Sequence, residues 1–481
     1  MQYRMERKSP VFDKLSGALI ITKREVRDQF RDWRIIFPIL GLTLFFPFLM
    51  NFTARTIMNF VENYGASILG ERMVPFLLMV VGFFPISVSL VIALESFVGE
   101  KERGSIEPLL NTPLEDWQLY LGKLLSSTIP PLASSYLGMA VYLVGLQIKG
   151  VPIPDFPILF QIIILTTVQA VMMVSGAVVV STQATSVRAA NLLASFIIIP
   201  SALLIQGESI VMFWGNNTTL WWVVAGVVLL TILFVRVGLA HFHREELLGR
   251  EIDVLNIRWG FRLFFKQFSG EAASVGDWYM RVLPAALRKL GLPILLVSVI
   301  VVASFIIGYF QIDRFQVELS NINLDNISDR VASATGAWGG LAAMPVTIIW
   351  WQNVRALLIG LVLGIFSLGI LSPIPIIATM GLAGYLMALL QTGGVSVLSY
   401  LVLLLPHGVI EIPAAVIATA AVMRVGGLIA TPVVDKPVAE VLIVGLADWA
   451  KIMLGLVIPL LLIAAAVESW VTPQVAVWFL S

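Results

Sequence analysis

Long apolar runs are the feature that most limits how this chain can fold. Eleven such runs, most of them near the roughly 20 residues that a membrane-crossing helix needs, divide the 481 residues. Charged residues make up 13% of the chain, against about 25% in a soluble domain, which excludes a water-soluble fold. The sequence therefore predicts an all-α polytopic membrane protein with about eleven transmembrane helices. The runs lie at residues 35–53, 74–95, 125–147, 158–182, 189–206, 220–240, 291–310, 347–371, 374–391, 398–423 and 441–467.

The longest polar stretch follows the sixth run and separates six runs from five. We therefore expect a six-span domain at residues 1–250, a cytosolic linker at 251–290 and a five-span domain at 291–481. The runs at 189–206 and 374–391 are short and have proline at one end, so each fits either a full span or a re-entrant segment.

Lysine and arginine are distributed unevenly among the segments that join these runs. With the N-terminus in the cytosol, 24 of the 31 basic residues fall on the cytosolic side, 6 fall outside, and Lys451 lies in a span. Cytosolic loops of membrane proteins carry an excess of Lys and Arg, so we expect a cytosolic N-terminus. An odd number of spans then places the C-terminus outside.

Composition also excludes several classes of function. The net charge is +1, so no overall positive field attracts nucleic acid, and we expect no nucleic-acid partner. Cysteine is absent, which excludes disulfides, thiolate metal sites and a cysteine nucleophile. No Ser-His-Asp triad or accessible carboxylate dyad stands out, so we expect no catalytic residues and a protein that is not an enzyme.

Two charged segments lie on the expected cytosolic side. In residues 21–34, charges of both signs alternate with apolar residues that lie near one helical face, which suits a helix lying flat in the membrane interface; a basic flank is the alternative. Residues 95–123 place six acidic residues between two spans, and Gly99, Gly104 and Pro113 divide the segment into short helices. Such an elbow suits docking to a soluble partner, and a solvated loop is the alternative.

Together these segments resemble the permease subunit of type-2 ABC exporters, over about residues 1–250. In that family an RE…D…R helix precedes the first span, an E…ER…G(S/T)-E-L-L-x-P signature follows the second, and GK opens the third. The residues here that match are Arg24, Glu25, Asp28, Arg31, Glu102, Arg103, Gly104, Ser105, Glu107, Leu109, Leu110, Pro113, Gly122 and Lys123.

The resemblance implies that the 95–123 elbow is a coupling helix that seats on a cytosolic ABC ATPase subunit. The expected coupling residues are Glu100, Glu102, Arg103, Gly104 and Glu107. The chain contains no G-x-x-x-x-G-K-[ST] loop, so we expect no directly bound cofactor, and ATP acts through the partner. The other expected partners are a second copy or a homologous permease, and membrane lipids. The expected location is the bacterial cytoplasmic (inner) membrane, crossed many times.

In the second half, ionisable residues at membrane depth are the informative feature, because such residues mark function or pairing. His407 and Glu411 are one helical turn apart, and Asn353, Arg355 and Glu468 are expected near them in depth. We favour a structural cluster in which Arg355 pairs with Glu411 and His407 completes the contact, and we expect no metal site. A proton or ligand site is one alternative. A metal site with one His and two Glu, to which Asn353 adds an oxygen, is another. In the last run, Asp448 and Lys451 are three residues apart and are expected to pair.

The same residues carry a second resemblance, over about residues 280–475. The patterns N-x-R, PHG-x-x-E-(I/L)-P and ES-x-V-T-P look like those of the stage II sporulation protein M family, whose members have five spans. The matching residues are Asn353, Arg355, Pro406, His407, Gly408, Glu411, Pro413, Glu468, Thr472 and Pro473. The namesake resembles a membrane anchor for peptidoglycan-degrading partners, so envelope hydrolases are further candidate partners.

Two functions fit these patterns. The first is the permease subunit of an ABC-type transporter that exports a lipid-like or amphipathic substrate, because polar groups are few in the first six spans. The second is a scaffold or mechanotransmitter that transports nothing and links an ATPase to envelope partners that remodel peptidoglycan.

Overall fold

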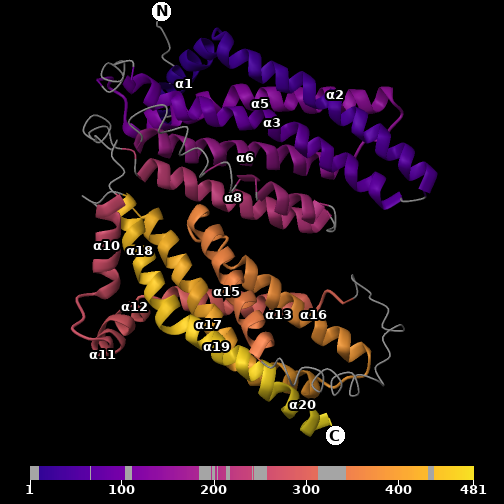
Figure 1. Ribbon diagram of the computed structural model, residues 1–481. Helices are drawn as coiled ribbons and strands as arrows, with labels where there is room; N and C mark the ends of the chain where they lie inside the picture. Colours follow the sequence, from indigo (N-terminus) through magenta and orange to yellow (C-terminus); the bar gives the residue numbers. More distant parts are fainter. Residues whose placement is uncertain are drawn as a thin grey trace, which may run out of the picture. The chain divides into compact units, whose positions relative to one another are not determined.

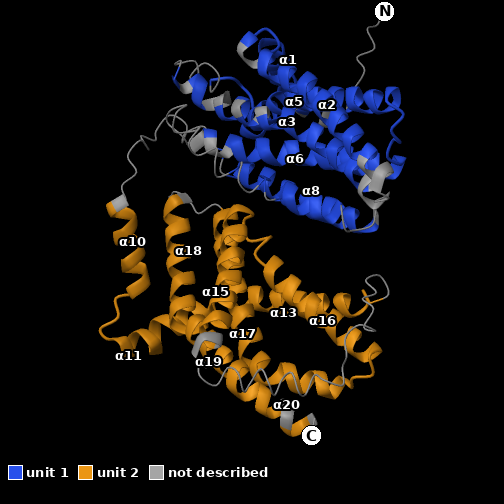
Figure 2. Cartoon of the chain, turned by 45° about the vertical axis from the view of Figure 1, so that its right-hand side comes forward, with its two compact units in different colours: residues 1–255 blue, residues 256–481 orange. Residues whose placement is uncertain are grey.

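The computed structural model of the chain divides into two compact units, residues 1–255 and 256–481 (Figure 2). Over the described residues the chain is helical and contains no strand, which confirms the expected all-α fold class. The structure describes residues 10–64, 67–102, 111–183, 197, 201–202, 204–212, 217–240, 242, 257–312, 343–431 and 438–480.

Unit 1 is a set of long helices that lie side by side (Figure 1). Its core runs along α3, which packs against α2, α5 and α6, and α1 packs on α5. Pro38 and Pro47 lie inside α2, and Pro130 and Pro131 inside α5, as membrane helices tolerate when neighbours satisfy the freed backbone groups. The helices are α1 (Pro10–Gln29), α2 (Trp33–Tyr64), α3 (Ser67–Glu102), α5 (Asp116–Ile148), α6 (Phe156–Gln183) and α8 (Asn217–Ala240).

Unit 2 begins with short helices and continues with long apolar ones. The last of these form one continuous path from residue 438 to residue 480, interrupted by two π-helical turns. The elements are α10 (Ile257–Ser269), α11 (Val275–Asp277), η1 (Trp278–Val282), α12 (Leu283–Arg288), α13 (Gly291–Tyr309), α15 (Ala343–Phe366), α16 (Ile374–Thr392), α17 (Val397–Ala430), α18 (Val438–Ile452), η4 (Met453–Val457), α19 (Ile458–Ala466), η5 (Val467–Val471) and α20 (Thr472–Leu480).

Residues 257–290, assigned to a linker from their polarity, instead fold with unit 2. Helix α10 packs along α18, and α12 also contacts α18. Trp278 explains the attachment, because its indole nitrogen donates to the carbonyl of Phe268 (2.8 Å) and its ring packs against the unit-2 core. Residues 257–290 are therefore part of unit 2. The polarity of the segment did not reveal the attachment through Trp278.

Ten helices in the described part of the chain are long and apolar enough to cross a membrane. They correspond to ten of the eleven expected spans, and the eleventh, at 189–206, lies largely outside the described residues. The short run at 374–391 forms one uninterrupted helix, α16, which qualifies by length and composition. The protein is therefore a multi-pass membrane protein.

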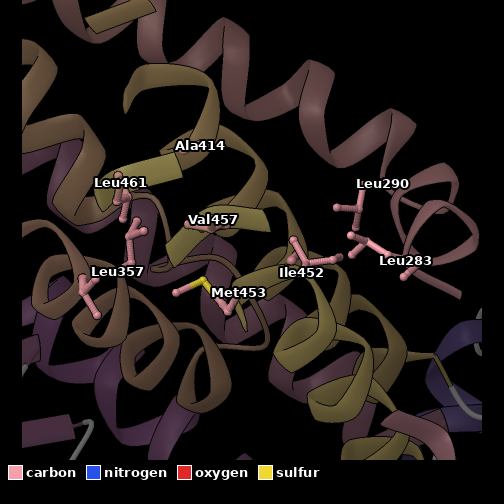
Figure 3. Packing of buried hydrophobic residues seen from close by; sticks show 12 residues of the cluster. Leu283, Leu290, Leu357, Ala414, Ile452, Met453, Val457 and Leu461 are labelled. Atoms are coloured by element: carbon pink, nitrogen blue, oxygen red, sulfur yellow. The ribbon is translucent and has the colours of Figure 1, made fainter. Parts of the chain in front are cut away.

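The unit-2 core is built where α12, α15, α17 and the 438–480 path meet. Figure 3 shows Leu357 beside Met453, and Leu283 and Leu290 beside Ile452. Ala414, on α17, is fully buried in the same cluster. Small side chains on α17 therefore let the large side chains of its neighbours fill the space between the helices.

Glycines bring two helices of unit 2, α13 and α16, into direct backbone contact at two places. A side-chain carbon on Gly308 of α13 would collide with the carbonyl of Gly381 on α16, and one on Gly384 would collide with the carbonyl of Phe305. Membrane helices pack closely through small residues in this way, because lipid supplies no hydrophobic drive between them.

Candidate functional site

A buried lysine joins three elements at one end of unit 1. Lys123 lies at the start of α5 with 1% of its side chain exposed. Its Nζ lies 2.6 Å from Oε1 of Glu100 near the end of α3, and 3.3 Å from Oε1 of Glu25 on α1. A buried ammonium group is tolerated only with such partners. We call Lys123, Glu25 and Glu100 the lysine triad.

The same three elements are held together by close packing around the triad. Gly122 lies against Ala18 and Ile21 of α1, where a side-chain carbon would come within 3.0 Å of the Ala18 carbonyl. The hydroxyl of Thr22 on α1 donates to the Gly122 carbonyl at 3.2 Å. At the α3 end, the backbone N–H of Val98 donates to the Ser181 hydroxyl on α6 (3.2 Å). The triad therefore sits inside a rigid joint between the interfacial helix and the spans.

The expected coupling elbow begins and ends at this joint. Glu100 is a member of the triad, and Glu102 is exposed at the end of α3. Arg103, Gly104 and Glu107 lie outside the described residues. The chain is described again from residue 111, just before α5 starts at Asp116.

The sequence did not predict the contacts of Lys123 with Glu25 and Glu100. Glu25 and Lys123 were matched to family patterns, but no contact between them was expected. The available signal was Lys123 itself, because a lysine at the start of an apolar span requires a carboxylate near it. Its partners could not be named, because they lie on two other helices.

In unit 2, three of the five expected cluster residues come together. Ligand atoms of His407, Glu411 and Glu468 all lie within 4.8 Å of one another, and all three residues are half-buried. His407 and Glu411 share a face of α17, while Glu468 comes from η5. The Nδ1 atom of His407 lies 3.3 Å from the hydroxyl of Thr472, the first residue of α20. We call His407, Glu411 and Glu468 the unit-2 cluster.

The expected ion pair between Arg355 and Glu411 is absent from the part of the chain that the structure describes. Arg355 is exposed, on the same side of α15 as Trp351. Its neighbours Val354 and Leu357 are buried and face the unit-2 core instead. The pairing had been expected because Arg355 and Glu411 lie at similar depth on their helices. The rotation of α15 about its axis points Arg355 away from Glu411, so the expected pairing is wrong.

Asn353 also stands apart from the unit-2 cluster. It is half-buried on α15, and among the described residues no hydrogen bond joins it to His407, Glu411 or Glu468. The cluster therefore consists of two carboxylates and one imidazole, without the cation that was expected to neutralise them.

A separate charged network lies in α18, where Asp448 and Lys451 pair as expected. Oδ1 of Asp448 lies 2.7 Å from Nζ of Lys451, which is 5% exposed. Asp448 also accepts hydrogen bonds from Lys289 (3.1 Å) and from Gln267 of α10 (3.1 Å). These two contacts were not expected, because they come from the segment that had been assigned to a linker.

Comparison with known families agrees with both resemblances. Residues 19–219 match the family model described as ABC-2 family transporter protein, and residues 294–473 match the model described as Stage II sporulation protein M. A search of curated proteins and a search of solved structures gave no match.

The matched segments and the apolar helices define the class of this protein. It is a multi-pass membrane protein, and helices α2, α3, α5 and α6 of its first unit fall within the segment that matches the ABC-2 family transporter model. The segment that follows is similar to Stage II sporulation protein M, as the sequence motifs had indicated.

Proposed function

We propose that this chain is the permease subunit of an ABC exporter and is driven by a separate cytosolic ATPase that docks on the 95–123 elbow. The observation that carries the proposal is the lysine triad. Lys123 ties the start of the third span to the end of the second span and to the interfacial helix α1. A force applied to the elbow therefore reaches three elements at once.

The surface of unit 1 supports an apolar or amphipathic substrate. Helix α2 exposes an aromatic face on which the side chains of Phe37, Phe48 and Phe52 are 59%, 75% and 64% exposed. Such an aromatic face suits lipid tails or a second permease subunit. We therefore propose a lipid-like or amphipathic substrate, and a homodimer or a pair with a homologous permease.

The test compares substitutions at the two ends of α5. The chain is purified from its native membranes together with the ATPase that accompanies it, and thermal unfolding and ATP hydrolysis are measured. Lys123→Met removes the cation that Glu25 and Glu100 share, and breaking such a buried pair costs about 3–5 kcal/mol of folding free energy. We expect a lower melting temperature and a loss of the hydrolysis that depends on the complex.

Lys149→Met is the matched control, because Lys149 caps the far end of α5 and is exposed. It should leave the melting temperature and ATP hydrolysis nearly unchanged, because a surface substitution changes the free energy of unfolding by no more than about 0.5 kcal/mol. Glu102→Ala, at an exposed position, should lower the melting temperature less than Lys123→Met does and should weaken retention of the ATPase. Robust ATP hydrolysis by the isolated chain, or a Lys123→Met complex identical to the parent, would contradict the proposal.

The match of residues 294–473 to Stage II sporulation protein M favours a second candidate function. In that case the ATPase drives a scaffold that passes a signal to peptidoglycan-remodelling partners, and nothing is transported. The lysine triad would have the same role in both cases. Recovery of an envelope hydrolase with the chain, with no ATP-dependent movement of lipid in vesicles, would select the scaffold.

A further inference from the structure

We propose that the unit-2 cluster is a binding site for a divalent transition-metal ion of the Zn²⁺ type, with His407, Glu411 and Glu468 as ligands. One nitrogen and two carboxylate groups converge from two elements to within 4.8 Å of one another. Among the described residues, no hydrogen bond joins any two of the three, so their ligand atoms lie close together without bonding to each other.

The charge of the cluster calls for a cation. Two carboxylates and an imidazole lie within 4.8 Å of one another and are half-buried in membrane-spanning helices, where acidic groups are costly without a partner. The structure describes no ion pair from a Lys or Arg side chain to Glu411 or Glu468, and Arg355 is exposed elsewhere on α15. A divalent metal ion supplies the positive charge that the protein itself does not.

A chain of hydrogen bonds presents the correct atom of His407. The hydroxyl of Thr472 donates its only hydrogen to the carbonyl of Val467 at 3.3 Å. With that hydrogen used, the oxygen accepts from His407, 3.3 Å away, in the tautomer that is protonated at Nδ1. That tautomer leaves Nε2 unprotonated, with a lone pair for a metal. Histidine ligands commonly donate their second ring N–H to a neighbour in this way, which fixes the ring.

The backbone that carries Glu468 is itself irregular. Glu468 lies in η5, and π-helical turns inside α-helices occur frequently at functional sites. On the other side of the cluster, Pro406 and Pro413 bracket the turn of α17 that carries His407 and Glu411. A proline-containing helix and a π-helical turn thus lie against each other at this point of the unit.

The donor set determines the kind of ion. Mg²⁺ and Ca²⁺ prefer oxygen alone, whereas imidazole together with carboxylate suits Zn²⁺ and its transition-metal neighbours. Three protein ligands that are only half-buried leave a coordination position open to water or to a ligand, as in zinc sites that carry out chemistry. The cluster therefore fits an open site better than a closed structural one.

The experiment measures metal binding directly and needs no activity assay. The full chain, purified in detergent on an affinity tag without histidine, is stripped with a chelator and titrated with Zn²⁺ and Co²⁺. We expect one ion per chain by elemental analysis, a Co²⁺ absorption band in the visible range, and a higher melting temperature with metal. A parent protein that binds neither ion at micromolar free concentration overturns the proposal, whatever the variants do.

The variants then locate the site. His407→Gln, Glu411→Gln and Glu468→Gln should each abolish stoichiometric binding, whereas Glu440→Gln, on the same helical path, should leave it unchanged. Thr472→Val should weaken binding by about 10–100-fold, the usual effect of losing such a positioning residue, and Thr472→Ser should restore it. Binding that persists at parental affinity in a folded Glu411→Gln/Glu468→Gln protein would place the ion elsewhere and overturn the assignment.

Discussion

At the scale of single residues, each unit contains a lysine that is almost fully buried and is paired within that unit. Lys123 meets two carboxylates from two other helices, and Lys451 meets Asp448 on its own helix. Burying an ammonium group costs several kcal/mol, which only well-placed partners offset. The contacts of Lys123 therefore hold α1, α3 and α5 in fixed relative positions.

The network around Asp448 gives a test with an internal comparison. Asp448→Ala removes the partner of buried Lys451 and should lower the free energy of unfolding by about 3–5 kcal/mol. Lys289→Ala removes only the partner that is 44% exposed, and should lower it by less than about 1 kcal/mol. Thermal unfolding in detergent, followed by tryptophan fluorescence, measures both. Equal effects of the two substitutions would mean that the buried pair is not what stabilises this site.

At the scale of helices, the turn between α15 and α16 is held against α17 by backbone contact. Gly426 of α17 leaves room for Leu368 and Gly369, whose backbone atoms would overlap a side-chain carbon at that position. Both turn residues have positive φ angles, 53° and 92°. A non-glycine residue with positive φ is uncommon, so the contact keeps Leu368 in a conformation that it would otherwise seldom adopt.

Neighbouring glycines of α17 provide a matched pair for testing this contact. Gly426→Ala should destabilise the protein by about 2–3 kcal/mol, because it overpacks the turn. At Gly427, no neighbouring atom lies within 4 Å of the place that a side-chain carbon would occupy, so Gly427→Ala should instead stabilise α17 by up to about 1 kcal/mol through helix propensity. Melting temperatures of the two variants measure the difference. A Gly426→Ala protein as stable as Gly427→Ala would show that the turn moves away freely.

At the scale of the whole molecule, the sequence predicts sidedness, which the helices alone do not determine. Arg258 and Asp325, the latter outside the described residues, are separated by one candidate span, α13. Arg258→Cys should therefore react with a membrane-impermeant thiol reagent only from the cytosolic side, and Asp325→Cys only from outside. The parent chain has no cysteine and is therefore the negative control for labelling. Reaction of both from one side would contradict the expected topology.

Helix positions could be predicted from the sequence because lipid requires continuous apolar runs, and α16 and α17 lie where those runs are. Depth in the membrane could be predicted too, which is why His407, Glu411 and Glu468 were grouped correctly. The direction in which the Arg355 side chain points could not be predicted. Depth in the membrane does not determine how a helix is rotated about its axis, and the residues on both sides of Arg355 are apolar. The partners of Lys123 were hidden for a related reason, since they come from helices whose packing the sequence does not give.

The two π-helical turns of the last helical path affect how such proteins should be aligned. A π-turn closes its hydrogen bond over one residue more than an α-turn does, and each residue of an α-helix turns the chain by about 100°. A relative with an uninterrupted α-helix would therefore need one residue fewer for each of the two turns to point its ends in the same directions. In an alignment, single-residue gaps belong inside Met453–Val457 and Val467–Val471, within an apolar span, instead of in the loops where gaps are usually placed.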